Sequence, residues 1–479
     1  MRKRRHNDSD RGGSKKKKKK KRNASYISNK QIRKIGWSGN STTTTSGRFN
    51  DTIRGGFRDD AQILKRHSRK KKGTNGKSKT AKFRNDYKGF RIDDKSVIPI
   101  LKEPIDPKRF FEQFVAKRRP CVFRSSSTSS RSNVVFKSEV KKKWSDLKYL
   151  SDKAGDVNVR VERRSSNHES FGRGQYENMR FAKFLKLLEE GRGSEAYYMN
   201  TQRFEGSEDE LLTGPLKKLC DDFPLIPDLC QNLIPADYNV WMGRTGESSS
   251  GLHHDYHDNL YVLLKGRKRF RLFSPRDAQE MKTHGNIKRV WQNGCICYSK
   301  DILADGVHRD DRKRFEVETR QKEIENEMEI IQKKLKYGSS NLLEETYARL
   351  ETELEDILES SLSLMMENET STHRSTKIEI KNKMPPHFSQ IDINNVNTHT
   401  PSFREAYTNR MATVEIEEGD MLYLPAGWFH EVQSKPSAES PWHFAFNYWF
   451  HPPTTSSFEE PYDSKYHSNV WDSIIKDLK

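Results

Sequence analysis

The sequence has little of what membrane, secreted and zinc-binding proteins usually contain. No apolar run approaches the ~18 residues that a membrane helix needs, and no apolar segment follows the basic N-terminus to make a secretory signal. The five cysteines are an odd number, and none forms a Cys-x-x-Cys pair, so neither a disulfide framework nor a zinc module is expected. Cys295 and Cys297 would share one face of a strand, where a metal site is the less favoured interpretation. These absences indicate a soluble intracellular protein.

Apolar residues are also scarce for a chain of this length. Only 32% of the 479 residues are hydrophobic and another 32% are charged, so a good part of the chain cannot bury enough apolar surface to offset its ordering entropy. The net charge of +21 lies at the front of the chain. Residues 1–90 hold 30 Lys and Arg against 6 Asp and Glu, which leaves 58 against 61 for residues 91–479. The folded part is therefore expected to be close to neutral.

Residues 1–90 are predicted to be a disordered basic tail, rich in Lys, Arg, Ser, Gly, Asn and Thr. Its densest basic run is Lys15, Lys16, Lys17, Lys18, Lys19, Lys20, Lys21 and Arg22. Such runs bind import receptors or hold nucleic-acid phosphates by releasing counterions, and the alternative is a solvated tail with no dedicated partner. We therefore expect localisation in the nucleus, with the cytoplasm as a second compartment.

Ordered sequence is expected from residue 91 onward. Helical spacing is found in residues 107–115, 143–150 and 181–188. Strand patterns are found in residues 120–123, 157–161 and 196–199. From 239 to 273 and from 412 to 450 the chain consists of short β-strands between Gly and Pro turns, the pattern of a sandwich or barrel. We predict one mostly β domain with flanking helices over 91–455. A helical tail over 456–479 follows, and its helix is a candidate surface for a homodimer.

A segment of a different kind separates the two β-rich blocks. Apolar residues recur at alternating spacings of four and three, with Glu and Lys between them. The positions are Ile324, Met328, Ile331 and Leu335, and then Leu343, Tyr347, Leu350, Leu354 and Ile357. This spacing predicts a charged helical hairpin resembling a coiled coil. Residues 305–400 are therefore interpreted as an insertion in the β domain that serves as a spacer or partner surface rather than as part of a site.

His253 and Asp255 are the candidate metal ligands of the first β-rich block. Residues two apart on a strand project from one face, so His-x-Asp with a distant His can bind Fe(II) through two imidazoles and one carboxylate and leave the other positions open. The motif alone is weak, because it occurs three times, starting at His6, His253 and His308. The first copy lies in the tail and the third precedes a run of charge. Only the copy at His253 precedes the predicted hairpin 259–273.

Lys268 gives an independent indication of a site. Three arginines alternate with Lys268, Phe270 and Leu272, so period 2 puts the lysine on the apolar, inward face of its strand. A buried ammonium needs an anion, and no acidic residue lies on that face of the strand. The distal carboxylate of 2-oxoglutarate would supply this charge while its keto-acid end chelates iron. The alternative is that Lys268 reaches the rim or pairs with an acid elsewhere in the sequence.

His430 is the candidate third ligand. It follows an apolar strand and a turn, and its strand pair is expected to lie across the barrel from His253. The nearby alternatives are His254, His257 and His443. The first of these is out of phase with Asp255 on the strand and should point away from it.

Several motifs follow one another along the two β-rich blocks. They are His253-His254-Asp255, Asp258-Asn259-Leu260, Lys265-Gly266-Arg267-Lys268-Arg269 with Phe273-Ser274-Pro275, Gly419-Asp420-Met421-Leu422-Tyr423-Leu424-Pro425 with Trp428-Phe429-His430, and Phe446-Asn447-Tyr448-Trp449. In order and internal spacing they resemble those of JmjC-domain oxygenases. The upstream segments 114–122 and 197–199 resemble the small protein-hydroxylase subgroup that includes the JmjC lysyl hydroxylases. The resemblance covers residues 95–300 and 410–455 and is interrupted by the helical insertion.

The resemblance implies a double-stranded β-helix, the jelly-roll barrel of the cupins, that uses Fe(II), 2-oxoglutarate and O2. It implies that His253, Asp255 and His430 bind the iron and that Lys268 binds the distal carboxylate. It places further co-substrate contacts at Tyr198, Ser250, Asn259 and Asn447.

The activity expected from this resemblance is hydroxylation of a protein side chain, lysyl or similar, with release of succinate and CO2. The first alternative is a histone or protein lysine demethylase, which would use the same oxidant on an N-methyl group. The second is a catalytically silent cupin adaptor that binds nucleic acid or protein through the basic tail and the insertion. The lack of a zinc-finger or reader module favours the hydroxylase, and the complete ligand triad with Lys268 argues against the adaptor.

Overall fold

The computed structural model describes residues 83–93, 97–124, 138–164, 172, 174–190, 196–201, 211–244, 248–338, 340–372, 384–435 and 441–477. Most of the predicted basic tail lies outside these ranges, so its disorder and its partners stay predictions. The predicted boundary at residue 90 is wrong. β1 (Arg84–Asn85) pairs with β11 (Arg289–Val290), and the Tyr87 side chain is buried. The composition of residues 1–90 did not predict this, because a short strand and one buried tyrosine hardly change the average of a long basic stretch.

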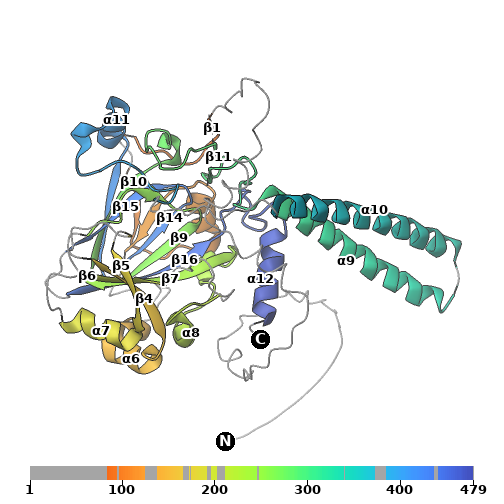
Figure 1. Ribbon diagram of the computed structural model, residues 1–479, viewed down its shortest axis with the longest axis horizontal. Coiled ribbons are helices and arrows are strands. Elements are labelled where there is room, and N and C mark those ends of the chain that lie inside the picture. The colour runs from red at the N-terminus through yellow and green to blue at the C-terminus, as the bar shows by residue number, and fades with distance from the viewer. Residues whose placement is uncertain are drawn as a thin grey trace, which may run out of the picture.

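The strands form two sheets that face each other across an apolar core (Figure 1). The larger sheet contains, in order, β2 (Ile100–Leu101), β3 (Cys121–Phe123), β14 (Met421–Leu424), β9 (Asp258–Lys265), β16 (Trp442–Phe450), β7 (Pro235–Arg244), β6 (Ala196–Asn200), β4 (Asn158–Arg164) and β5 (Gln175–Arg180). The smaller sheet contains β13 (Ala412–Ile416), β10 (Arg267–Phe273), β15 (Phe429–Lys435) and β8 (His253–His254). A third sheet joins β1 and β11 to β12 (Ile296–Cys297). The predicted mostly β jelly-roll barrel is confirmed.

The chain passes from one sheet to the other at Gly266. β9 pairs with β14 and β16, whereas β10 pairs with β13 and β15. The predicted hairpin over 259–273 is therefore wrong, because its two strands belong to different sheets. Gly266 adopts a φ of 92°, which glycine tolerates without steric cost. Period-2 alternation is the same in a hairpin and in a strand that bends into another sheet, so the sequence pattern does not distinguish them.

Helices cover the outer face of the larger sheet. They are α4 (Pro107–Phe110), the π-helix η1 (Phe111–Val115), α5 (Ser138–Ser145), α6 (Leu147–Ala154), α7 (Phe181–Glu190) and α8 (Leu216–Leu219). β16 shows how alternation separates the two faces. Phe444, Phe446 and Tyr448 belong to the core under the helices, whereas His443 and Asn447 are in the opposite phase and face the barrel interior. Polar side chains therefore enter the barrel on a strand that is fully buried.

The predicted insertion holds two long helices that project from the barrel (Figure 1). α9 (Arg309–Leu335) and α10 (Asn341–Thr372) pack along a narrow stripe in which Ile324, Ile331 and Leu350 are buried. The other six apolar positions named from the spacing flank this stripe. No helix in the described part of the chain is both long and apolar enough to cross a membrane.

The C-terminal helix α12 (Tyr466–Asp477) packs on its own chain. Trp471 and Ile474 contact the core under the helices, and the Tyr466 ring meets Phe315 of α9 edge-on, with centroids 5.0 Å apart. Apolar side chains that were candidates for self-association are thus used within the chain. Homodimer formation stays a prediction.

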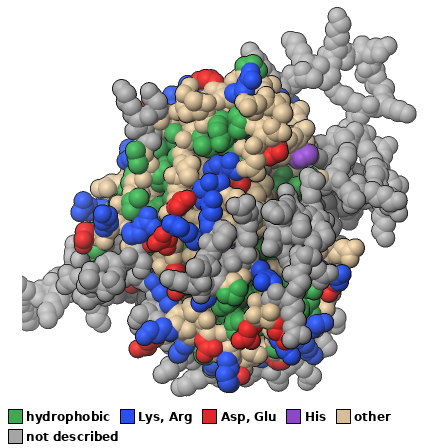
Figure 2. All heavy atoms as spheres, turned by 90° about the vertical axis from the view of Figure 1, so that its left-hand side faces the viewer, with side chains coloured by type: hydrophobic (Ala, Val, Ile, Leu, Met, Phe, Trp, Pro, Cys, Tyr) green, Lys and Arg blue, Asp and Glu red, His purple; other side chains and the backbone are tan. Residues whose placement is uncertain are grey.

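Charges of both signs interleave on the face shown in Figure 2. On the outer side of the smaller sheet, Arg267 lies 3.1 Å from Glu417 and 3.7 Å from Glu415. This mixture agrees with the near-neutral balance of residues 91–479.

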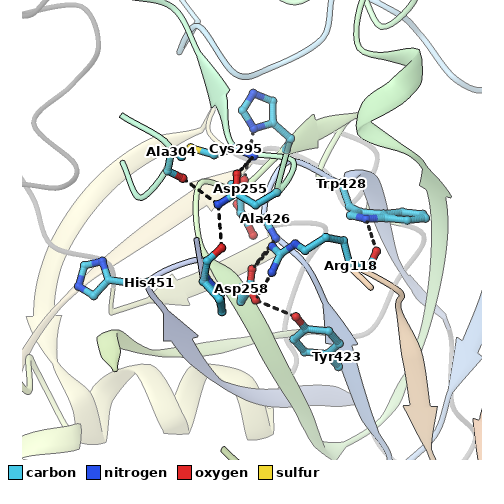
Figure 3. Close-up of polar contacts among 12 residues, drawn as sticks. Arg118, Asp255, Asp258, Cys295, Ala304, Tyr423, Ala426, Trp428 and His451 are labelled. Carbon is cyan, nitrogen blue, oxygen red and sulfur yellow. Dashed lines mark hydrogen bonds and ion pairs between the residues drawn. The ribbon is translucent and has the colours of Figure 1, made fainter. Parts of the chain in front are cut away.

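A buried ion pair joins distant parts of the barrel (Figure 3). The Asp258 carboxylate is fully buried and accepts from Arg118 Nη1 at 2.8 Å. The same carboxylate accepts from the Tyr423 hydroxyl at 2.7 Å and from the Ala426 backbone N–H at 2.9 Å. The Trp428 indole N–H donates to the Arg118 carbonyl at 3.2 Å. These contacts fix the beginning of β9 and the turn before β15 relative to each other.

Replacing Arg118 with Met should leave the Asp258 carboxylate buried without its cation, and we expect the free energy of unfolding to fall by about 3–5 kcal/mol. Urea denaturation followed by circular dichroism measures this change. The control is Lys148→Met, which breaks the exposed pair with Asp152 and should hardly move the unfolding midpoint. A loss in the Arg118 variant no larger than in the control would contradict the role given to the buried pair.

Candidate metal centre

The structure brings His253, Asp255 and His430 together. Their ligand atoms all lie within 4.8 Å of one another, and His430 Nε2 is 3.7 Å from Asp255 Oδ2. β8 and β15 are neighbouring strands, and their register places His430 directly opposite His253. The expectation that these residues face each other across the barrel is therefore wrong. Both histidines come from one sheet, and Asp255 follows directly after β8.

Backbone carbonyls orient both imidazoles. His253 Nδ1 donates to the Gly251 carbonyl at 3.0 Å, and His430 Nδ1 donates to the Trp428 carbonyl at 3.0 Å. Because a carbonyl only accepts, each Nδ1 carries the proton and each Nε2 keeps its lone pair for a metal. Burial, and then the neighbouring His430, lower the pKa of His253 to about 4, so its ring is neutral at physiological pH.

This donor set fits a divalent iron ion. Two imidazoles and one carboxylate on one side of a point form the facial triad that non-haem Fe(II) oxygenases use, with open positions on the other side. No other cluster of three such groups occurs in the described ranges. The barrel thus offers one place where these three residues can share an ion.

The alternative histidines lie elsewhere. His254 lies in the opposite phase to His253: its Nε2 is 2.8 Å from the Tyr298 hydroxyl and its Nδ1 is 3.3 Å from the Asp255 backbone carbonyl, so both ring nitrogens are engaged outside the triad. Burial lowers its pKa to about 3. His308 of the third His-x-Asp copy caps α9, because its Nδ1 accepts from the Asp310 backbone N–H at 3.2 Å. Of the two copies that the structure describes, the one favoured by sequence context is thus the one that lies beside His430, while His6 lies outside the described residues.

Lys268 lies inside the barrel in phase with Phe270 and Leu272, as predicted, and only 3% of it is exposed. Its ammonium donates to Ser434 Oγ at 2.7 Å. Within the described residues it has no carboxylate as an ion-pair partner. Burial, and then Arg164, lower its pKa to about 7. Lys268 is therefore a buried cation whose charge is not compensated by an acid of the described chain.

The other predicted co-substrate residues differ in how their polar groups are used. The Ser250 hydroxyl accepts from the Val432 backbone N–H at 2.9 Å and donates to the Gly251 carbonyl at 2.9 Å, so the backbone already engages it. Asn259 Oδ1 is buried and lacks a hydrogen-bond partner in the described structure. The Ser250 hydroxyl is therefore already used by the backbone, whereas Asn259 Oδ1 is available to a ligand.

Tyr198 and Asn447 border the same interior. Asn447 Oδ1 accepts from the Trp241 indole N–H, so Trp241 orients a polar group as well as packing. The Tyr198 ring lies 6.5 Å from the Trp241 ring, and burial raises the pKa of its hydroxyl. Their co-substrate contacts stay predictions.

Asn239 is a site candidate that the sequence interpretation missed. It lies opposite Asn447 on the neighbouring strand, is fully buried, and neither amide atom has a hydrogen-bond partner in the described structure. Such a side chain is rare, since buried amides are nearly always paired. The available signal was an asparagine in the inward phase of an apolar strand.

The end of the insertion also reaches the metal centre. The Phe388 ring stacks on His253, with centroids 5.0 Å apart and planes 12° apart. The Ser389 backbone N–H donates to the Leu252 carbonyl at 2.8 Å, so this segment continues the edge of the sheet beside β8. The interpretation of residues 305–400 as a spacer outside the site is therefore wrong for the return segment from residue 384 onward. Absence of helical periodicity had made this segment look featureless.

Residues 107–456 match the cupin-like domain family. The chain belongs to this family. JmjC domain-containing protein 4 of Schizosaccharomyces pombe is 29% identical over 442 residues, covering 80% of this chain and 91% of that protein. The bifunctional peptidase and (3S)-lysyl hydroxylase JMJD7 of Homo sapiens is 26% identical over 194 residues, covering 38% of this chain and 55% of that protein. The lysine-specific demethylase JMJ32 of Arabidopsis thaliana is 24% identical over 185 residues, covering 36% of this chain and 50% of that protein.

The family match agrees with the resemblance inferred from the motifs and spans the helical insertion. It includes all three residues of the triad, together with Lys268. A JmjC-type cupin barrel is thus confirmed as the setting of the candidate metal centre.

Shortening Phe388 to Ala should loosen the His253 imidazole, and we expect the affinity for Fe(II) to fall about tenfold, as for other residues that orient metal ligands. Competition with a metal-binding dye under oxygen-free conditions measures this affinity. Phe315→Ala is the matched control, because it removes a similarly half-buried ring, which contacts Tyr466 edge-on at the same centroid distance of 5.0 Å. Equal affinities of the two variants and the parent protein would show that Phe388 does not support the ligand.

Proposed function

We propose that this protein is an Fe(II)- and 2-oxoglutarate-dependent oxygenase that hydroxylates a protein side chain, lysyl or similar. The observation that carries the proposal is the triad combined with Lys268. Lys268 lies opposite Ser434 in the strand register, and Ser434 is four residues beyond His430 on β15. Along the strand, the backbone positions of His430 and Ser434 are therefore about 13 Å apart. A dicarboxylate that spans the gap between an ion at the triad and the Lys268 ammonium satisfies both ends.

Each group has a defined role in this proposal. His253, Asp255 and His430 would hold Fe(II) on one face, and Lys268 would orient 2-oxoglutarate through its distal carboxylate. When bound, iron supplies the oxidative decarboxylation of 2-oxoglutarate by O2 and the oxidation of a substrate C–H bond. Phe270 and Leu272, on the same face of β10 as Lys268, belong to the apolar core between the two sheets and would keep water away from the bound 2-oxoglutarate.

Two observations bear on the choice between hydroxylation and demethylation. The similarity to a lysyl hydroxylase and to a lysine demethylase is nearly equal, at 26% and 24% identity. The resemblance of segments 114–122 and 197–199 to the protein-hydroxylase subgroup favours hydroxylation. Lysine demethylation is the second candidate. The complete triad disfavours a silent adaptor, because such a protein has no need for a ligand set that fits Fe(II).

Purified protein with Fe(II) should convert 2-oxoglutarate to succinate, and His253→Ala should reduce this conversion to background because one of three ligands is lost. Succinate release measures the reaction. His308→Ala is the control, since it alters a His-x-Asp copy at a helix cap and should leave the rate unchanged. Undiminished succinate release by His253→Ala would refute the metal assignment. Mass spectrometry of cellular proteins then separates the two activities, because hydroxylation adds one oxygen and demethylation removes methyl groups.

The affinity for 2-oxoglutarate should depend on pH through Lys268. Below pH 7 the lysine is already charged and the affinity should be flat. Above pH 7 the free lysine loses its proton and binding of the carboxylate must restore it, so the affinity should fall by up to about tenfold per pH unit. Calorimetric titration of Fe(II)-loaded, oxygen-free protein measures this profile. Lys268→Arg keeps a permanent charge and should give a flat profile, and the same slope in both proteins would exclude Lys268 as the titrating group.

A further inference from the structure

Two glycines let His443 pack close to Lys268. A Cβ added at Gly266, two residues before Lys268, would lie only 3.0 Å from His443 Cβ. At Gly243 on β7, an added Cβ would lie 2.6 Å from Tyr198 Cδ2 and 3.1 Å from His443 Nε2. The Tyr198 and His443 rings lie on either side of this point, with centroids 5.6 Å apart. Any side chain at position 243 would push the two rings apart. The glycine therefore permits a polar ring from β16 and a phenol from β6 to share the barrel interior.

Arg164 brings a second buried cation to this end of the barrel. Arg164 of β4 is 3% exposed, and its guanidinium lies 5.4 Å from the centre of the Tyr198 ring. Its Nε is 4.0 Å from the Glu162 carboxylate. The charge of Lys268 is not compensated by a carboxylate of the described residues, and Arg164 lowers its pKa. A buried ammonium of this kind favours a ligand that brings a negative charge.

His443 is held neutral beside these two cations. It is fully buried, and burial, followed by the charges of Lys268 and Arg164, keeps the pKa of its ring well below the usual range. A neutral imidazole has one N–H donor and one acceptor nitrogen. Neither ring nitrogen has a hydrogen-bond partner in the described structure. The side chain therefore presents an unused donor next to the lysine that is proposed to hold a carboxylate.

We propose that His443 is a co-substrate-binding residue that donates a ring N–H to the distal carboxylate of 2-oxoglutarate, beside Lys268. This inference rests on the proposed function and assigns part of its specificity. The carboxylate offers four lone-pair directions, so it can accept from the Lys268 ammonium and from the imidazole at once. Arg164 supplies background positive charge that favours a dicarboxylate over a monocarboxylate. His443 was named from the sequence only as an alternative metal ligand, and the structure gives it a different position.

Two probes that differ only at the distal end test the proposal. Full-length, Fe(II)-loaded protein is titrated calorimetrically, without oxygen, with 2-oxoglutarate and with 2-oxopentanoate, which has a methyl group in place of the distal carboxylate. His443→Leu should weaken 2-oxoglutarate binding about tenfold or more and leave 2-oxopentanoate binding unchanged, because one hydrogen bond to a charged group is lost. His443→Gln, which retains an N–H donor, should recover part of the preference. Circular dichroism establishes that each variant is folded.

The controls separate this proposal from the proposed function. His467→Leu removes another buried histidine, one that lies 3.4 Å from Asp305, and should keep the preference of the parent protein. If His443→Leu also keeps the full preference while Lys268→Ala loses it, His443 has a structural role only and the inference is overturned, although the proposed function stands. If the parent protein does not prefer 2-oxoglutarate, both the inference and the proposed co-substrate are wrong.

Discussion

The buried carboxylate of Asp258 fixes the geometry on which the candidate metal centre depends. It lies three residues after Asp255 and accepts from the backbone of Ala426, four residues before His430. The two parts of the chain that carry the ligands are thus tied to one group through hydrogen bonds of at most 2.9 Å. Because the pair with Arg118 is shielded from water, a displaced partner would leave an uncompensated charge, and this penalty keeps the arrangement in place.

Two tight turns complete what the ion pair begins. Gly427 has a φ of 76°, and an added Cβ would lie 1.8 Å from the Gly294 carbonyl oxygen. Its backbone N–H donates to the Asp255 carbonyl at 2.8 Å, which links the turn before β15 directly to a candidate ligand. Gly266 bends the chain from one sheet into the other and so brings Lys268 inward on the strand beside His430. The buried ion pair, the two glycine turns and the strand register therefore together position Asp255, His430 and Lys268.

Local patterns in the sequence predicted the parts of the site that depend on strand phase. Lys268 alternates with apolar residues, so its inward position followed from period 2, and the outward position of His254 followed from the same rule. Pairing between strands was not predictable in this way. The hairpin expected at 259–273 is a passage between sheets, and His430 lies beside His253 instead of across the barrel, because alternation carries no information about which strand is the neighbour. Phe388 was missed for a related reason: its role comes from contact with a residue more than a hundred positions away, in a segment without periodicity.

The return segment after α10 gives the insertion two unequal parts. The hairpin of α9 and α10 has its own apolar stripe, whereas the residues that follow it are joined to the barrel. Arg271 of β10 donates to the Asn394 side chain at 2.7 Å, and the Ser389 backbone N–H donates to the Leu252 carbonyl, directly before β8. In the part of the chain that the structure describes, the outer turns of the hairpin pack only on each other, through Ile331, Leu335 and Leu343, so a change of its length there would leave the barrel's own contacts in place. The return segment is hydrogen-bonded to the barrel at both of these points, so a change of length there would move the residues that border the candidate metal centre.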